Sequence, residues 1–154
     1  MATTYSQIHI QLVFAVKFRR CAMLKSWREE LFKYIAGIVR ENGHKLLSIN
    51  GVEDHIHVLI GMRPTQAVST LVQEIKKASS KWINQRRLVV GGFYWQEGFG
   101  VFSYSKDALV NVIRYIENQE EHHRKKSFVD EFTSLLKEFN VQYDPNYVRQ
   151  IEAK

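Results

Sequence analysis

The pattern of hydrophobic and polar residues along the chain predicts four β-strands. Residues 5–18 are rich in β-branched and aromatic side chains, which is typical of a strand. Two more strands are expected at residues 44–52 and 55–62, joined by a tight turn. Residues 91–104 are aromatic and punctuated by glycine, and they predict a fourth strand with room for a bulge.

Helices are predicted between and after these strands, since apolar residues recur there at close to helical spacing. Ser26 is the expected cap of the first helix and Gly43 its stop, and Ser105 is the expected cap of the third. Ser127 and Asp130 form an S-x-x-D capping pattern for the last helix. The predicted helices cover residues 27–42, 65–85, 106–126 and 128–139.

The resulting order is β-α-β-β-α-β followed by helices, which is the split βαβ arrangement of ferredoxin-like, or RRM-like, α+β folds. Such a fold has an antiparallel sheet with helices on one face, and it can leave the other face open for a ligand. A chain of 154 residues is long enough for one hydrophobic core, so we expect a single domain over residues 1–154.

Charge distinguishes this chain more than its hydrophobic content does. Lys and Arg number 22 against 16 Asp and Glu, a formal net charge of +6. A basic domain of this size often binds an anionic polymer such as nucleic acid. Cys21 is the single cysteine, which excludes an internal disulfide and a CxxC metal site. No apolar run is long enough to span a bilayer and the first residues do not resemble a signal peptide. We therefore expect a cytoplasmic protein with no membrane partner.

Two histidines stand two residues apart in the third predicted strand. Alternate side chains of a strand point to the same face, so His55 and His57 lie side by side while Ile56 faces the other way. Imidazoles at this spacing can bind one divalent ion together. A pair of structural, hydrogen-bonded histidines also explains the motif, and a metal site requires at least one more ligand.

The third predicted helix supplies candidates for the remaining chemistry. At about 100° per residue, Tyr115 and Gln119 lie together on the edge of its apolar face, and His122 continues the same strip. Each residue alone is ordinary on a helix surface. Beside two histidines, they offer a hydroxyl nucleophile and a carboxamide oxygen that can bind a metal.

Basic residues gather in several short groups, which together could neutralise several phosphates of a nucleic acid. Aromatic residues near them could stack on unpaired bases. The aromatic candidates are Trp82, Phe93, Tyr94, Trp95 and Phe99, of which one or two at most are expected to contact DNA. The candidate DNA-binding basic residues are Lys17, Arg19, Arg20, Lys76, Lys77, Lys81, Arg86 and Arg87.

Four segments in this order resemble the HUH single-tyrosine transposases of bacterial and archaeal insertion sequences, the IS TnpA type. They are LVFAVKFRR, DHIHVLI around the histidine pair, FYWQEGFGVFSYS, and VIRYIENQEEHHRK with its tyrosine four residues before a glutamine. The resemblance covers most of the chain, from about residue 5 to about residue 130.

This resemblance implies a ferredoxin-like homodimer that cuts and rejoins single-stranded DNA at the hairpin-forming ends of insertion sequences. It implies Mg²⁺ or Mn²⁺ as cofactor, with His55, His57 and Gln119 as ligands. Tyr115 is the implied nucleophile, which leaves a 5′-phosphotyrosine and a 3′-hydroxyl. In members of this family the tyrosine helix can serve the histidine pair of the partner subunit. The last predicted helix, which lies outside the βαββαβ order, adds a candidate dimer surface. Tyr104 departs from the family pattern, which has a small aliphatic residue there.

Three other functions remain open. A non-catalytic RNA-binding or single-stranded-DNA-binding module of the same fold would use sheet aromatics, and EGFGVFSY is close to the RNP1 sequence of such modules. It would require neither the histidine pair nor the strip of Tyr115 and Gln119. A metal-dependent hydrolase would use the histidines, although the chain lacks an H-x-H-x-D-H extension. A host-adopted relative would cleave DNA without moving an element.

Overall fold

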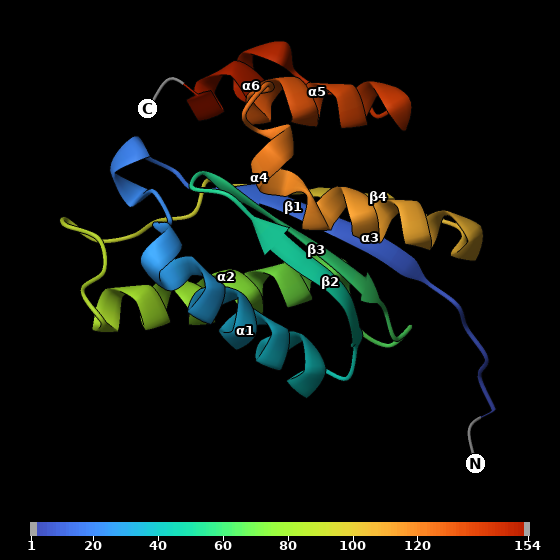
Figure 1. Cartoon of the computed structure of the whole chain (residues 1–154). Coiled ribbons are helices and arrows are strands. Elements are labelled where there is room, and N and C mark those ends of the chain that lie inside the picture. Colours follow the sequence, from blue (N-terminus) through green and yellow to red (C-terminus); the bar gives the residue numbers. More distant parts are fainter. Residues whose placement is uncertain (1–2, 153–154) are drawn as a thin grey trace.

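The computed structural model describes residues 3–152 and confirms the predicted α+β class with a four-stranded antiparallel sheet (Figure 1). The spatial order is β2-β3-β1-β4, so the first and third strands lie at the centre, as in ferredoxin-like folds. The strands are β1 (His9–Ala15), β2 (Lys45–Gly51), β3 (His55–Gly61) and β4 (Gly100–Ser103).

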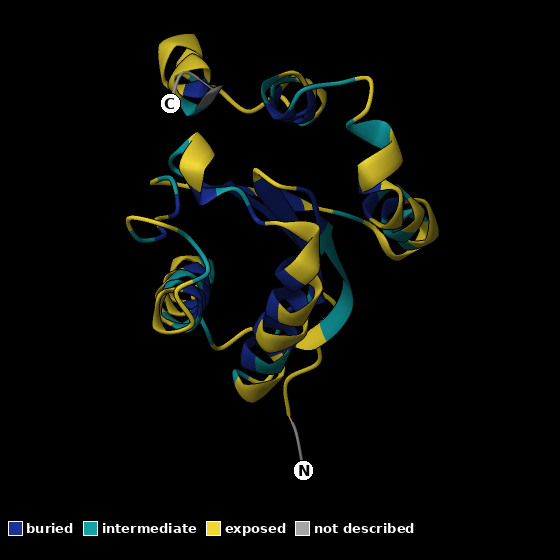
Figure 2. Ribbon diagram, turned by 60° about the vertical axis from the view of Figure 1, so that its left-hand side comes forward, coloured by how far each residue is buried: buried dark blue, intermediate teal, exposed yellow. Residues whose placement is uncertain are grey.

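Helices cover both faces of this sheet. They are α1 (Lys25–Glu41), α2 (Val68–Gln85), α3 (Leu109–Glu117), α4 (Gln119–His122), α5 (Phe128–Glu138) and α6 (Pro145–Glu152). Helices α1 and α2 lie on one face and α3 to α5 on the other, with the buried residues on the sheet and on the helix sides turned toward it (Figure 2). None of the helices within residues 3–152 is long and apolar enough to cross a membrane.

The expectation of an open sheet face is wrong, because the C-terminal helices cover it. Phe128 and Phe132 of α5 belong to one buried cluster with Ala15 and Phe102 of the sheet. Helix α3 packs Val112 and Ile116 against Leu59 of β3 in a second cluster. Apolar side chains alternate onto this face as well as onto the α1–α2 face, so both faces require a cover. The apolar side of α5 is therefore used within the chain and does not support a dimer surface.

The aromatic segment predicted as one long strand pairs only over its last residues. Residues 91–99 form a loop with an isolated bridge between Val16 and Trp95. Three glycines of this loop have φ angles of 84° to 87°, which interrupt the extended backbone that pairing requires. Phe93 and Trp95 are nonetheless buried, so these aromatic residues contribute to core packing and not to strand pairing. The three glycines are Gly91, Gly92 and Gly98.

The third predicted helix is interrupted as well. After a 3₁₀ turn (Lys106–Ala108), the chain forms α3, breaks at Asn118 and resumes as α4. The side-chain amide of Asn50 in β2 donates to the carbonyls of Ile116 and Glu117, at 3.0 and 3.2 Å. It thereby satisfies carbonyl groups that a helix leaves free at its C-terminus. The break lies directly before Gln119, which is buried.

Two of the four predicted helix boundaries are confirmed. The Ser127 hydroxyl accepts a hydrogen bond from the N–H three residues later, at 3.2 Å, and Gly43 follows α1 with a φ of 82°. Ser26 is not the cap of α1, because the helix begins one residue before it. Ser105 precedes the 3₁₀ turn but its side chain makes no capping hydrogen bond.

Candidate active site

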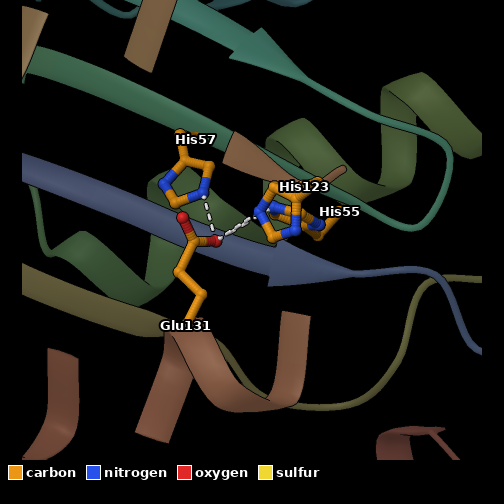
Figure 3. Close-up of side chains that lie close together, drawn as sticks. All are labelled: His55, His57, His123 and Glu131. Atoms are coloured by element: carbon orange, nitrogen blue, oxygen red, sulfur yellow. Dashed lines mark hydrogen bonds and ion pairs between the residues drawn. The ribbon is translucent and has the colours of Figure 1, made fainter. Parts of the chain in front are cut away.

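Strand β3 places His55 and His57 side by side on the face that α3 to α5 cover (Figure 3). Both side chains are fully buried, and their ring centroids lie 5.0 Å apart. The facing residues of β1 are Ala15 and Val13, whose small or branched side chains leave space for two rings. The strand geometry expected from the H-x-H spacing is therefore present.

A hydrogen-bond acceptor holds the outer nitrogen of each imidazole. His55 Nδ1 lies 2.7 Å from Asp54 Oδ1, and His57 Nδ1 lies 2.6 Å from Gln11 Oε1. Because both partners are acceptors, each Nδ1 carries a proton and each Nε2 faces the inside of the cluster. Gln11 in turn donates to the Tyr104 hydroxyl at 2.7 Å. Tyr104, the residue that departs from the family pattern, thus supports the orientation of His57 through Gln11.

Two residues that sequence reasoning missed complete the cluster. Glu131 on α5 directs its Oε1 atom at three imidazole Nε2 atoms (Figure 3). The distances are 3.1 Å to His55, 3.0 Å to His57 and 3.0 Å to His123. His123, directly after α4, therefore belongs to the same cluster as the H-x-H pair.

The sequence contained one signal that pointed to Glu131. Phe128, Phe132 and Leu135 define the apolar side of α5, and position 131 lies between them at helical spacing. A carboxylate on the buried side of a helix is rarely left without a partner. Glu131 is only 2% exposed, so its position on that stripe was informative.

The cluster holds one cation and one anion at neutral pH. Burial lowers the pKa of His55, but hydrogen bonds with Asp54 and Glu131 outweigh burial and raise it to about 9. Burial acts to raise the pKa of Glu131, but its contacts with His55 and His57 lower it to about 2. Burial and the charge of His55 lower the pKa of His123 to about 4. Burial also lowers the pKa of His57, so these last two rings are neutral.

Helices α3 and α4 bring the predicted tyrosine and glutamine to this cluster. The hydroxyl of Tyr115 donates a hydrogen bond to Glu131 Oε2, and its ring centroid lies 5.9 Å from that of His57. Gln119 is buried, with its Oε1 atom 3.1 Å from His55 Nε2. Its amide nitrogen donates to Glu131 Oε2 at 3.1 Å. The structure thus gathers all four predicted site residues in one place, within a single chain.

The donor atoms of the cluster fit a divalent cation. His55, His57, His123 and Glu131 each offer one ligand atom, and these four atoms lie within 4.8 Å of one another. The amide oxygen of Gln119 lies beside them. The neutral rings and the carboxylate direct lone pairs at one another, so their approach requires a proton or a metal ion between them. The chemistry of this donor set therefore suits a metal.

Two pockets border the cluster, one lined by His123 and the other by Glu131. A pocket of about 280 Å³ is lined by Tyr115, His122 and Glu131. His122 is half-buried, and its ring centroid lies 5.2 Å from that of Tyr115. A larger pocket of about 550 Å³ is lined by Asp54 and His123. Basic residues that line the larger pocket are Arg19, Arg28, Arg124 and Lys126.

Part of the predicted DNA-binding set lines a third pocket, of about 790 Å³, between α2 and the 91–99 loop. Tyr94 and Phe99, which are exposed, line it together with Lys17, Lys76 and Lys77. The ammonium group of Lys76 donates to the carbonyls of the loop at 2.6 and 2.8 Å, and burial lowers its pKa to about 8. Lys76 therefore holds the loop in place, which gives it a structural role in this pocket.

The other predicted cations lie at the end of α2 and near the first strand. Arg20 donates to the carbonyls of Val90 and Gly92 and so also holds the loop. The Arg86 guanidinium lies 4.3 Å from the ring centroid of Trp82. Lys81 and Arg87 are exposed, while Arg19 lines the 550 Å³ pocket. Of the aromatic candidates, Phe93 and Trp95 are buried and unavailable to bases.

Comparison with known proteins identifies relatives. The chain matches the family described as "Transposase IS200 like" over residues 4–119. It is 24% identical over 118 residues to the ISDra2 transposase TnpA of Deinococcus radiodurans, which covers 73% of this chain and 84% of that protein.

Two solved structures share the fold. One is a candidate transposase from Deinococcus radiodurans R1, with a TM-score of 0.61 and 22% identity, covering 77% of this chain and 95% of that one. The other is the REP-associated tyrosine transposase bound to a REP hairpin, with a TM-score of 0.60 and 16% identity, covering 80% and 73%. The family match over residues 4–119 includes the histidine pair, Tyr115 and Gln119, and it confirms the resemblance seen in the four segments. The chain belongs to the IS200-like transposase family.

Proposed function

We propose that this transposase cuts and rejoins single-stranded DNA at insertion-sequence ends through a covalent bond between Tyr115 and a 5′ phosphate. One observation carries the proposal: the Tyr115 hydroxyl contacts Glu131, whose carboxylate also contacts the Nε2 atoms of His55 and His57. A nucleophile and a cation-binding group therefore lie within reach of one phosphate. Family membership supports the same chemistry.

A divalent cation, Mg²⁺ or Mn²⁺, would be held by His55, His57 and Gln119. When bound, such an ion supplies a Lewis acid that polarises a non-bridging oxygen of the scissile phosphate. Asp54 and Gln11 fix the two imidazoles through their Nδ1 atoms, so that each Nε2 stays directed into the cluster. The protein thus sets the ligand orientation before DNA arrives.

Tyr115 carries out the covalent step. A tyrosine hydroxyl has an ordinary pKa near 10 and is a weak nucleophile at neutral pH. The Tyr115 hydroxyl gives up its proton to solvent, its oxygen bonds to phosphorus, and the bond from phosphorus to the 3′ oxygen breaks. The departing 3′ oxygen takes up a proton in turn, so the step is balanced. The products are a 5′-phosphotyrosine and a 3′-hydroxyl. Because one phosphodiester replaces another of similar energy, a 3′-hydroxyl can reverse the step without ATP.

Single-stranded DNA with a hairpin is the proposed substrate. The chain is basic overall, and Lys17, Lys77, Tyr94 and Phe99 line a pocket beside the 91–99 loop. The relative described as bound to a REP hairpin supports a hairpin partner. Cations that neutralise phosphates release counterions, so binding should weaken steeply with added salt.

We also propose that the protein acts as a homodimer, on the strength of the family resemblance. Multi-angle light scattering at working concentration should give twice the mass of the 18.1 kDa chain. A stable monomer would remove this part of the proposal and leave the single-chain cluster of Tyr115 and the histidines unaffected.

Cleavage assays on matched DNA substrates test the proposal. A labelled single strand that contains a hairpin should be cleaved with Mg²⁺ or Mn²⁺ and should stay intact with EDTA. The same sequence as a full duplex should stay intact under both conditions. Equal cleavage of the duplex, or cleavage in EDTA, would contradict the proposal.

A further inference from the structure

Glu131 occupies the centre of the imidazole cluster. The Glu131 Oε1 atom lies 3.0 to 3.1 Å from three Nε2 atoms, and the carboxylate is almost fully buried. In an octahedral site with bonds of about 2.1 Å, neighbouring ligand atoms lie about 3.0 Å apart. The distances from Glu131 Oε1 to the three Nε2 atoms therefore match those between neighbouring ligands of one ion.

The orientation of the rings also fits ligation of one ion. Nδ1 of His57 faces the acceptor oxygen of Gln11 at 2.6 Å, so Nε2 is the ring nitrogen that faces the cluster. His57 Nε2 lies 3.0 Å from Glu131 Oε1, and the Nε2 atoms of His55 and His123 lie at 3.1 and 3.0 Å from the same oxygen. One divalent ion can bind all four of these atoms together.

The opposite oxygen of the same carboxylate is also held. Gln119 donates its amide N–H to Glu131 Oε2 at 3.1 Å, and Tyr115 donates its hydroxyl to the same atom. These two donors fix the rotation of the carboxylate, and they leave Oε1 directed at the imidazoles. Buried ligands with their outer atoms held in this way are typical of a prepared metal site.

We infer that His123 and Glu131 are two further ligands of the cation, and that the completed site selects first-row transition ions over Mg²⁺. This inference rests on the proposed function and goes beyond its ligand set of His55, His57 and Gln119. Three imidazoles are ligands that Mn²⁺, Co²⁺ and Zn²⁺ accept, whereas Mg²⁺ prefers oxygen ligands and retains its water. His123, directly after α4, thus supplies the ligand that determines the metal specificity, and α5 supplies the carboxylate.

Titration calorimetry with Mn²⁺ on the full chain tests the inference. Glu131→Gln keeps the shape of the side chain and His123→Asn removes one imidazole; each should weaken Mn²⁺ binding by about tenfold or more. The matched controls are Asp130→Asn, an exposed carboxylate on the same helix, and His9→Asn on β1; both should bind as the wild type does. Unchanged or tighter binding by Glu131→Gln or His123→Asn would overturn the inference.

A measurement on the wild-type chain does not depend on how the variants fold. Pulsed EPR of bound Mn²⁺ in protein labelled with ¹⁵N-histidine should show coupling to three imidazoles, and coupling to only two would overturn the inference. Mn²⁺ should also bind at least about tenfold more tightly than Mg²⁺, whereas equal affinities would contradict the selectivity.

Metal binding by the variants separates failure of the inference from failure of the proposed function. If His55→Ala loses Mn²⁺ binding while both Glu131→Gln and His123→Asn retain it, the inference fails and the proposed metal-dependent function stands. If the wild type binds no divalent ion, both fail together.

Discussion

The hydroxyl of Tyr115 on α3 donates a hydrogen bond to the carboxylate of Glu131 on α5. The other oxygen of that carboxylate contacts His55, His57 and His123. A single buried side chain therefore connects the proposed nucleophile with the histidine cluster. The packing of α5 on the sheet therefore determines the geometry around Tyr115, although α5 lies outside the βαββαβ core.

Removal of the side-chain amide that holds His57 should destabilise the fold. Gln11→Leu leaves the Nδ1–H of His57 buried without an acceptor, which costs about 1 to 3 kcal/mol of unfolding free energy. Urea denaturation in EDTA measures this loss. Tyr104→Phe removes only the hydroxyl that accepts from Gln11, so it should cost about 1 kcal/mol. Equal stability of Gln11→Leu and the wild type would contradict this account of the His57 orientation.

A pair of glycine substitutions tests how closely α5 is seated on the sheet. A Cβ at Gly100 would lie 2.5 Å from a ring atom of Phe132, next to Glu131, so Gly100→Ala must shift the ring with which α5 packs on β4. Overpacking of this kind costs about 1 to 3 kcal/mol of unfolding free energy.

Gly37 on α1 provides the matched control. A Cβ there meets no atom within 4 Å, so Gly37→Ala should raise stability by up to about 1 kcal/mol. Thermal denaturation of both variants distinguishes them. If Gly100→Ala were as stable as Gly37→Ala, the close contact between β4 and α5 would be wrong.

The metal-free protein should lose stability as the pH rises through the titration of His55. Contacts with Asp54 and Glu131 raise the folded-state pKa of His55 from 6.5 to about 9. The raised pKa of His55 therefore adds to the free energy of unfolding in full below pH 6.5. This added stability is lost between pH 6.5 and 9, at about 1.4 kcal/mol per pKa unit. Urea denaturation in EDTA at several pH values measures the slope. Asp54→Asn should flatten it, and a wild-type slope of zero in this range would contradict the His55–Asp54 contact.

The protein should also lose stability in acid, because the pKa of Glu131 is lowered whereas that of His55 is raised. Contacts with His55 and His57 lower the pKa of Glu131 from 4.5 to about 2. The corresponding stability is present above pH 4.5 and is lost as the pH falls toward 2. Glu131→Gln has no carboxylate to protonate, so its stability should depend less on pH in that range.

The sequence contained most of the site because local periodicity determines which side chains share a face. A period of two placed His55 and His57 together, and a spacing of four placed Tyr115 beside Gln119. Glu131 and His123 meet these residues only through the docking of α5 and the break after α3. No local pattern encodes that docking, although an acidic residue on the apolar stripe of α5 marked the position.

The fold class followed from the order of elements. The wrong strand and helix bounds came from residue types that occur in more than one kind of local structure. Phe93 and Trp95 read as strand residues because they are aromatic, yet they pack into the core from a loop. The break before Gln119 depends on Asn50, a residue from a distant strand, and no helical periodicity contains that information.

Covalent capture of DNA on a denaturing gel tests the central claim most directly. The wild type and Tyr104→Phe, incubated with Mn²⁺ and a labelled single-stranded hairpin, should each carry label on the protein band. Tyr115→Phe should carry none while it still binds the hairpin in a mobility-shift assay. Label on the Tyr115→Phe protein would show that another group attacks the phosphate and would contradict the claim.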